Sequence, residues 1–227
     1  MASTSISSNP AARPCIFSLE GSIAAGKTSI LHALQEARPA WSFSAEPLAV
    51  WEADNLLENF YKYPNAFCYQ FQQRIFASYT PIQNRAIQFS RQPVIIERGT
   101  RSAAQVFSAL GHYLQYLTAA QYQDILDTYE INGYLDFDRQ VNYIYIDSSP
   151  AGCYQRMRQR NRRAEASTIS LQYLTDLDSF YRREFLRPTT IFKPTIVIEN
   201  QELSLEDKVR QTTAVIEAVL QQQQHGI

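Results

Sequence analysis

The sequence predicts an α/β protein with a five-stranded parallel sheet and helices on both faces. Five short apolar runs alternate with segments of helical character, the pattern of β-α-β units that build parallel sheets. Several runs, such as residues 94–96, are continuously apolar, as expected for strands covered on both sides. The length of 227 residues suits one such domain. Because β-α-β crossovers are right-handed, the helices are expected on both faces of the sheet.

The elements follow in order along the chain. The expected strands are residues 15–19, 41–45, 93–96, 141–146 and 194–198. A helix is expected over residues 28–37, and long helical segments with mixed aromatic and Gln-rich periodicity cover about 64–90 and 102–131. Ser204, followed by Glu206 and Asp207, is a plausible start for the last helix, which runs into a Gln tract. The two long segments exceed what a minimal β-α-β unit needs, so they are candidates for a substrate wall or a subunit interface.

Composition is that of an ordinary enzyme. Hydrophobic residues make up 45% of the chain and charged residues 19%, and a chain of this size can bury a core without disulfides or structural metal. Lys and Arg total 21 against 22 for Asp and Glu, so the net charge points to no particular partner and gives no support to duplex binding. Cys15, Cys68 and Cys153 are odd in number and far apart, which predicts free thiols in a reducing compartment.

The sequence predicts neither a membrane span nor a secretory signal. No run of about 20 apolar residues predicts a membrane span, and residues 1–12 lack the apolar run of a secretory signal. We expect a flexible tail over residues 1–12, a single domain over residues 13–227, and a cytoplasmic or nuclear protein with no membrane partner.

Residues 21–28 read G-S-I-A-A-G-K-T and match the phosphate-loop pattern GxxxxGK[ST]. The match follows an expected strand and opens an expected helix, which is the setting that such a loop requires. Glycines let the backbone turn and aim N–H groups at phosphate oxygens, and the helix N-terminus faces the same anion. Lys27 would neutralise β- and γ-phosphate charge, and Thr28 would hold Mg²⁺. The predicted nucleotide-binding residues are Gly21, Ser22, Ile23, Ala24, Ala25, Gly26, Lys27 and Thr28.

The phosphate loop alone does not identify a substrate. No NKxD-type guanine motif, no DxxG after the loop and no LSGGQ segment occurs, so GTPases and transporters are disfavoured and a small-molecule kinase is favoured. Two expected strands end in Glu46-Pro47 and Glu97-Arg98, where ligands of open α/β sheets bind. One carboxylate could accept a hydrogen bond from an attacking hydroxyl and another could hold Mg²⁺. From the sequence alone, each is equally well explained as a helix cap or a surface group.

A dense group of arginines lies before Glu165. On a continuous helix, Arg156, Arg160 and Arg163 would share one face, and Arg158, Arg162 and Glu165 the opposite one. A lid that closes over a triphosphate would explain two basic faces, since arginine forks suit phosphate oxygens. The alternative is a solvated charge run or a nucleic-acid patch.

Together these residues resemble the deoxyribonucleoside kinase family over nearly the whole chain from Pro14 onward. The matches are the loop with Ile23, Glu46-Pro47 with Trp51, Leu56-Leu57-Glu58 leading to Tyr61-Lys62-Tyr63-Pro64, Phe71-Gln72, Glu97-Arg98, and the run from Tyr154 through Arg160 to Glu165. The resemblance implies a P-loop kinase fold with an Arg-rich lid and a homodimer through the long helices. It also implies transfer of the γ-phosphate of ATP, with Mg²⁺, to the 5′-hydroxyl of a deoxynucleoside.

The resemblance implies roles for single residues. Glu46 is the general base for the 5′-hydroxyl, Arg98 stands beside it, and Glu97 helps to bind Mg²⁺. For the substrate, Gln72 pairs with the base edge, Phe107 stacks on the base, Phe71 and Trp51 line the pocket, and Tyr61 and Glu165 hold the 3′-hydroxyl. For ATP, Arg160 and Arg162 contact phosphate and adenine, and a loop from about Asn200 holds adenine by its backbone.

Some residues depart from the family pattern. Gly99 stands where the family usually has Ser, Tyr79 where relatives carry Met or Arg, and Asp147 where relatives often have Arg. Ala103 replaces the Asp of purine- and cytosine-preferring relatives, which resembles the thymidine-accepting branch and leaves room for a thymine methyl. We therefore expect pyrimidines, thymidine especially, as substrates. The alternatives are a thymidylate kinase and, from another class, a nucleotide-dependent nucleic-acid-binding module.

Overall fold

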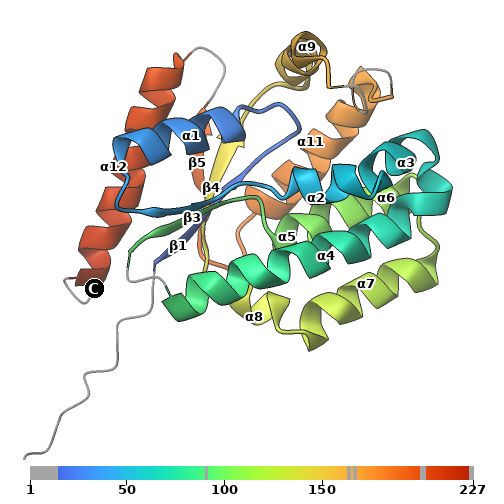
Figure 1. Ribbon diagram of the computed structural model, residues 1–227, viewed down its shortest axis with the longest axis horizontal. Coiled ribbons are helices and arrows are strands. Elements are labelled where there is room, and N and C mark those ends of the chain that lie inside the picture. Colours follow the sequence, from blue (N-terminus) through green and yellow to red (C-terminus); the bar gives the residue numbers. More distant parts are fainter. Residues whose placement is uncertain (1–14, 90–91, 163–164, 166–167, 200–202, 225–227) are drawn as a thin grey trace, which may run out of the picture.

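Five parallel strands form one sheet in the order β2-β3-β1-β4-β5, seen in the computed structural model of Figure 1. The strands are β1 (Ile16–Glu20), β2 (Ser42–Ser44), β3 (Val94–Glu97), β4 (Asn142–Asp147) and β5 (Ile196–Glu199). Each overlaps its predicted run, and β1, β3 and β4 are buried almost throughout, which confirms the predicted parallel sheet. The structure describes residues 15–89, 92–162, 165, 168–199 and 203–224, so the predicted tail at 1–12, Arg163 and Asn200 lie outside the described residues.

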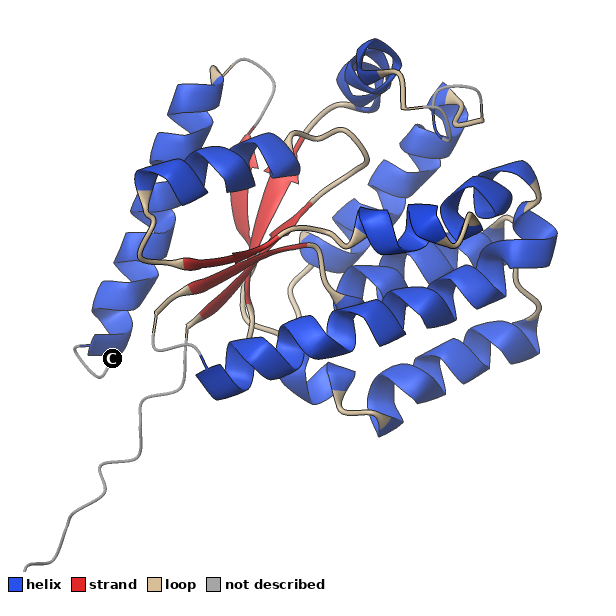
Figure 2. Ribbon diagram, in the orientation of Figure 1, coloured by secondary structure: helices blue, strands red, loops and turns tan. Residues whose placement is uncertain are grey.

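Helices cover both faces of the sheet, as predicted (Figures 1 and 2). On one side α1 (Lys27–Ala37) packs beside α12 (Leu205–Gln224), and α1 buries Ile30, Leu31 and Leu34. The other helices are α2 (Leu48–Ala53), α3 (Leu56–Lys62), α4 (Pro64–Phe89), α5 (Thr100–Ser102), the π-helix η1 (Ala103–Phe107), α6 (Ser108–Tyr113), α7 (Ala119–Ile131), α8 (Tyr134–Asp138), α9 (Pro150–Arg160) and α11 (Leu171–Phe185). No helix in these described ranges is long and apolar enough to cross a membrane.

The segment predicted as one helical stretch over 102–131 is divided in the structure. Gln115 adopts a left-handed backbone with φ of 62°, which ends the first helix, and α7 begins anew after Thr118. Thr118 accepts a hydrogen bond from the Gln121 backbone N–H, and the Gln121 side chain accepts one from the Thr118 N–H. This capping box supplies partners for helix-terminal N–H groups, so it fixes a helix start that periodicity alone did not show.

Two apolar clusters hold the fold together. The first surrounds the sheet and includes Phe17, Ile95 and Ile144. The second lies among the helices beyond the strand ends and includes Trp51 and Phe71. The carboxyl ends of β1, β2 and β3 open between the two clusters, which is where an open α/β sheet binds ligands.

Candidate active site

The phosphate loop lies between β1 and α1, and its backbone geometry requires glycine. Gly21 has a φ of 139°, and a Cβ there would stand 2.8 Å from the carbonyl oxygen of Ile146. Gly26 caps α1 in the left-handed region with a φ of 100°. The loop can therefore turn tightly under the helix N-terminus, where N–H groups and the helix dipole favour an anion. This geometry agrees with the predicted phosphate site.

Lys27 occupies the loop that it is predicted to serve. Its Nζ donates to the carbonyl oxygens of Gly21 at 3.0 Å and Ser22 at 2.8 Å. Burial, and secondarily the Arg98 guanidinium, lower the pKa of Lys27 to about 8. A phosphate would offer this ammonium group the negative charge that backbone carbonyls only partly supply, so the site is arranged to receive an anion.

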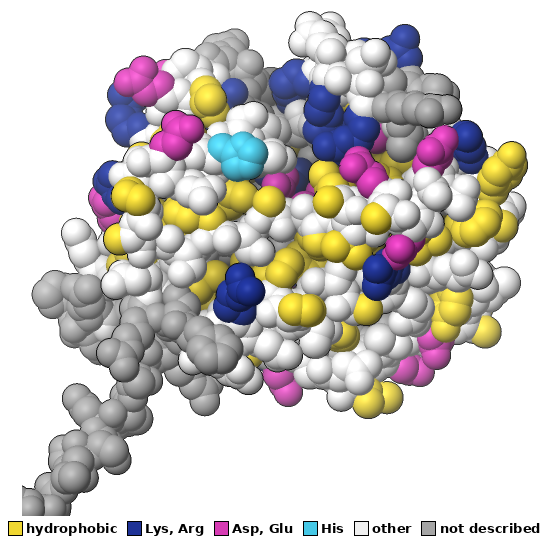
Figure 3. Space-filling model, viewed as in Figure 1, with side chains coloured by type: hydrophobic (Ala, Val, Ile, Leu, Met, Phe, Trp, Pro, Cys, Tyr) yellow, Lys and Arg dark blue, Asp and Glu magenta, His cyan; other side chains and the backbone are white. Residues whose placement is uncertain are grey.

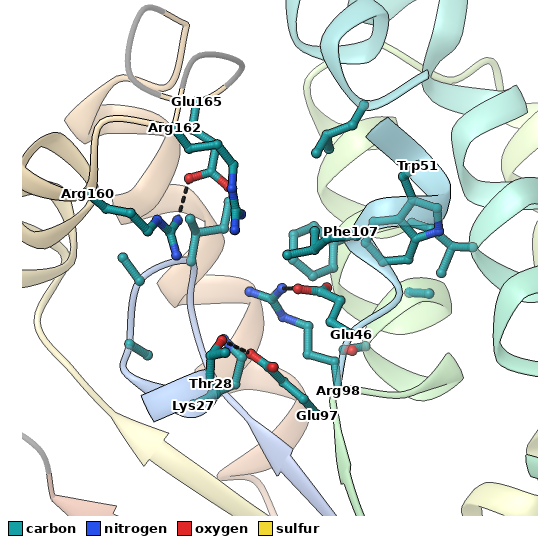
Figure 4. A pocket seen from close by; sticks show the side chains of 18 of the residues that line it. Lys27, Thr28, Glu46, Trp51, Glu97, Arg98, Phe107, Arg160, Arg162 and Glu165 are labelled. Carbon is teal, nitrogen blue, oxygen red and sulfur yellow. Dashed lines mark hydrogen bonds and ion pairs between the residues drawn. The ribbon is translucent and has the colours of Figure 1, made fainter. Parts of the chain in front are cut away.

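Thr28 and Glu97 meet at the floor of the site, where the end of β3 faces the start of α1 (Figure 4). The Thr28 hydroxyl donates to Glu97 Oε1 at 2.6 Å. A hydroxyl and a carboxylate are hard oxygen ligands of the kind that Mg²⁺ takes, usually together with waters and phosphate oxygens. These two predicted metal residues therefore fit Mg²⁺ chemically.

Arg98 and Glu46 form a nearly buried ion pair across the cavity from Lys27 (Figure 4). Arg98 Nη1 donates to both Glu46 oxygens, at 2.6 and 2.8 Å, and Arg98 Nε donates to the Tyr181 hydroxyl at 3.2 Å. The Glu46 charge and hydrogen bond raise the pKa of Arg98 well above its usual range despite the opposing effect of burial. The backbone of Arg98 is left-handed, with a φ of 57°, an uncommon conformation for a residue with a side chain. Glu46 is thus a carboxylate held beside a fixed cation.

Aromatic side chains from α2, α3 and α4 form one wall of the cavity. Trp51 meets Phe71 edge-on with ring centroids 5.5 Å apart, and Phe60 stacks on Phe71 at 5.0 Å. Phe107 stands at the end of η1, with the Arg98 guanidinium carbon 5.2 Å from its ring centroid. Flat apolar faces of this kind suit a planar aromatic group of a ligand. The π-helix that carries Ala103 and Phe107 is a rare element that is often found at functional sites.

The cavity has a volume of about 250 Å³ and gathers most of the predicted site residues in one place. Its lining includes Ile23, Ala24, Ala25, Gly26, Lys27, Thr28, Glu46, Trp51, Tyr61, Phe71, Glu97, Arg98, Ala103, Phe107, Arg160, Arg162 and Glu165. Gly21 and Ser22 lie in the buried part of the phosphate loop outside that lining.

Gln72 also lies outside the cavity lining, and its side chain is buried in α4. Its Oε1 has no hydrogen-bond partner among the described residues. An unpartnered buried amide oxygen costs free energy, so this atom has an unmet demand for a donor. The predicted contact with a base edge stays a prediction for this residue.

The arginine segment is arranged differently from the two-faced helix predicted for it. Helix α9 ends at Arg160 because Asn161 is left-handed, with a φ of 51°, so Arg162 does not continue a helical face. Arg160 and Arg162 instead converge on Glu165, the latter at 2.9 Å (Figure 4). Lys and Arg side chains gather at the upper part of the face in Figure 3. Arg160 and Arg162 line the cavity, and their predicted contacts with phosphate and adenine stay a prediction.

Two residues near the site were not singled out by sequence reasoning, and one contact of a third was not expected. Arg156, a member of the predicted arginine group, donates from Nε to the carbonyl oxygen of Ala24 in the phosphate loop at 2.8 Å. Glu20 is fully buried and precedes the loop directly. Tyr181 reaches Arg98 from α11, 83 positions along the chain, and nothing local in the sequence indicated that contact.

Asp147 and Gly99 depart from the family pattern. The structure shows which side chain pairs with Asp147 and how much space surrounds Gly99. Asp147 accepts a 2.5 Å hydrogen bond from Arg182, which also bonds Asp178. Gly99 is extended, and a Cβ there would stand 3.8 Å from its nearest neighbours, so the position has room for a side chain.

The chain is similar to several known proteins of one family. A family described as deoxynucleoside kinase matches residues 17–223. The chain is 30% identical over 215 residues to the mitochondrial deoxyguanosine kinase of Xenopus laevis, covering 83% of this chain and 79% of that protein. It is 30% identical over 171 residues to the thymidine kinase of Ictalurid herpesvirus 1 (73% and 72%), and 26% identical over 216 residues to deoxycytidine kinase 2 of Gallus gallus (82% and 77%). These names agree on the class of substrate and differ on the base.

Proposed function

Because the chain belongs to the deoxynucleoside kinase family, we propose that it transfers the γ-phosphate of ATP to the 5′-hydroxyl of a deoxyribonucleoside, preferring thymidine and other pyrimidines. One observation carries the proposal. The Glu46–Arg98 pair faces Lys27 and the Thr28–Glu97 pair across a single cavity that also has an aromatic wall. The reaction needs a carboxylate that accepts the hydroxyl proton, a loop that binds the phosphates and an apolar surface against which the base packs.

The chain's own residues supply positioning and charge. Glu46 accepts the proton of the 5′-hydroxyl, and Arg98 orients the carboxylate through two hydrogen bonds. Lys27 turns from the Gly21 and Ser22 carbonyl oxygens to the phosphates. Thr28 and Glu97 would hold Mg²⁺, which would neutralise charge on the phosphate oxygens. Phosphoryl transfer has a loose transition state, so such positioning and charge neutralisation matter more than strong base catalysis.

The base preference rests on two buried residues in the cavity wall. The Tyr79 ring stands 6.5 Å from Trp51, and its hydroxyl donates to the Glu97 carbonyl oxygen at 3.0 Å, so a large side chain is fixed at this end. Ala103 leaves space nearby without offering a hydrogen bond from its side chain. A fixed bulky wall favours the smaller pyrimidine ring, and the amide of Gln72 can pair with thymine or, flipped, with cytosine.

The arginines favour a nucleoside over a nucleoside monophosphate as acceptor. Arg98 is paired with Glu46, and Arg160 and Arg162 are paired with Glu165. A monophosphate acceptor would need a further cation directed at its phosphate. These arginines also line the cavity, which disfavours the nucleic-acid-binding alternative.

We further propose a homodimer formed through α4 and α7 and a location in the cytoplasm.

The test is an ADP-release assay with ATP and Mg²⁺ over thymidine, deoxycytidine, deoxyadenosine, deoxyguanosine and thymidine monophosphate. We expect turnover of the pyrimidine nucleosides, with thymidine ahead, and none of the monophosphate. Glu46→Gln is expected to lower kcat by at least about 100-fold, the usual contribution of a general base, with little change in ATP binding. Turnover of no nucleoside would refute the proposal, and an unaffected Glu46→Gln variant would remove Glu46 from its role.

A further inference from the structure

Tyr181 joins two parts of the site without lining the cavity. It lies in α11, fully buried, and its hydroxyl accepts the hydrogen bond from Arg98 Nε at 3.2 Å. Its ring meets Phe107 edge-on, at 6.0 Å and 89°. One residue from a distant helix thus contacts both the cation beside Glu46 and the ring predicted to stack on the base.

The Arg98 guanidinium is held on every edge. Glu46 binds Nη1, Tyr181 binds Nε, the Gly21 carbonyl oxygen lies 3.5 Å from Nη2, and Phe107 faces the plane. Of these, the carboxylate takes part in the reaction and the Gly21 contact is long. The Tyr181 hydroxyl is therefore the hydrogen-bond partner of Arg98 that is shorter than the Gly21 contact and has no part in the proposed reaction.

We propose that Tyr181 is a positioning residue whose hydroxyl fixes the orientation of Arg98, and through it the carboxylate of Glu46, relative to the base-stacking ring of Phe107. This inference rests on the proposed function, because it takes Glu46 as the group that accepts the 5′-hydroxyl proton. A guanidinium held at Nε can present Nη1 to Glu46 in one orientation only. Without that bond it can rotate, and the carboxylate loses its fixed partner.

The hydroxyl, rather than the ring, performs this role. The ring is held by its neighbours, with Phe185 stacked at 5.7 Å and Tyr145 tilted at 6.0 Å. Helix α11 is also linked to α5. Arg101 donates to the Glu184 carboxylate at 2.9 Å and to the Glu184 backbone oxygen at 2.8 Å. Burial raises the pKa of Tyr181, so the hydroxyl stays neutral. Removing that one oxygen should leave the packing of α11 in place.

Charged groups from several elements surround the Arg98–Tyr181 contact and are unchanged in the variant below. They are Glu20 at the end of β1, Lys27 at the start of α1, Glu46 after β2 and Glu97 at the end of β3. A change in kcat on removing the Tyr181 hydroxyl therefore reports a change in how Arg98 meets these groups.

The test compares Tyr181→Phe with a matched control, Tyr145→Phe. Tyr145 belongs to the same aromatic stack, but its hydroxyl bonds Asp178 at 3.3 Å, away from Arg98. Tyr181→Phe is expected to lower kcat for thymidine about 10- to 100-fold, the range for one hydrogen bond to a charged group, with the KM for ATP within about twofold. Tyr145→Phe should change neither quantity.

Two results would overturn the inference. One is a Tyr181→Phe enzyme that matches Tyr145→Phe in kcat. The other is a Tyr181→Phe enzyme whose kcat falls while its thermal stability falls below that of Tyr145→Phe and its KM for ATP rises more than twofold, which would make Tyr181 a packing residue only. Glu46→Gln, measured in parallel, separates the two proposals. If Glu46→Gln is inactive while Tyr181→Phe is normal, the inference fails and the proposed function stands.

Discussion

Glu20 is a carboxyl group placed out of reach of water, immediately before the phosphate loop. Ser18 donates to its Oε1 at 2.8 Å, and Oε2 has no hydrogen-bond partner among the described residues. Burial raises the pKa of Glu20 from its ordinary 4.5 to about 7, although Ser18, Arg98 and Lys27 oppose the shift. Between those pH values the folded protein keeps a proton that the unfolded chain has released. The stability that Glu20 contributes is therefore fully present below about pH 4.5 and is lost as the pH rises through about 7.

Glu20→Gln should remove this pH dependence, since an amide does not ionise. Urea unfolding at pH 5 and pH 8 should show the variant gaining stability relative to the parent protein at the higher pH, by up to roughly 3 kcal/mol. Glu36→Gln, at an exposed position of α1, is the control and should follow the parent protein at both pH values. A Glu20→Gln protein with the parent's pH dependence would contradict the burial of an ionisable group here.

Ala103 is the residue on which base preference is expected to turn. Ala103→Asp places a carboxylate in the cavity wall, where it can accept a hydrogen bond from the amino group of cytosine but meets the carbonyl O4 of thymine. We expect kcat/KM for thymidine to fall at least about tenfold relative to deoxycytidine, since one unpaired buried acceptor costs about 1–3 kcal/mol. Ala103→Asn, which adds similar volume without charge, separates size from charge. An unchanged thymidine preference in Ala103→Asp would refute the substrate inference.

At the scale of elements, α5 and α11 are joined by a buried cation. Arg101 is 1% exposed, and its guanidinium carbon lies 3.8 Å from the Phe192 ring centroid, 4.3 Å from that of Phe185 and 4.5 Å from that of Tyr143. Glu184 is its carboxylate partner. Together with Arg98 and Tyr181, this contact sets the register of α11 against the strand end that carries the ion pair of the site.

Arg101→Met should therefore destabilise the fold by about 3 kcal/mol, because it leaves a partly buried carboxylate unpaired and removes contacts with three rings. Arg139→Met is the matched control. Arg139 and Asp136 form an ion pair with side chains 49% and 75% exposed, and its loss should cost under about 1 kcal/mol. Chemical denaturation measures both, and equal effects would show that the buried contact adds nothing.

The predicted elements also show where tertiary packing overrides local sequence rules. Helix α4 runs through Pro81, as its apolar periodicity predicted, although proline normally disrupts a helix interior. Tertiary packing of residues such as Phe76 and Ala86 on either side accounts for its continuation. The continuous helix considered for the arginine segment does not form, because the left-handed Asn161 ends α9 and redirects Arg162.

At the scale of the whole molecule, the site is the seam between the sheet cluster and the helical cluster. The phosphate loop and the Thr28–Glu97 pair belong to the sheet side, and Trp51 and Phe71 belong to the helical side. Glu46 and Arg98 leave the ends of β2 and β3 and meet between them. Donor and acceptor substrates therefore approach from two sides of one cavity, and neither side alone contains the whole reaction centre.

The sequence by itself determined the strand runs, their parallel arrangement and the phosphate loop, and its resemblance to a known family indicated most of the cavity residues. The first three are local features, because a buried strand needs an apolar run and a tight phosphate loop needs glycine at Gly21 and Gly26. Only the tertiary structure decided that Tyr181 anchors Arg98, that Glu20 is buried beneath the loop, and that Arg160 and Arg162 converge on Glu165. Those contacts join residues on separate elements or across a broken helix, and their partners depend on packing that no local pattern encodes.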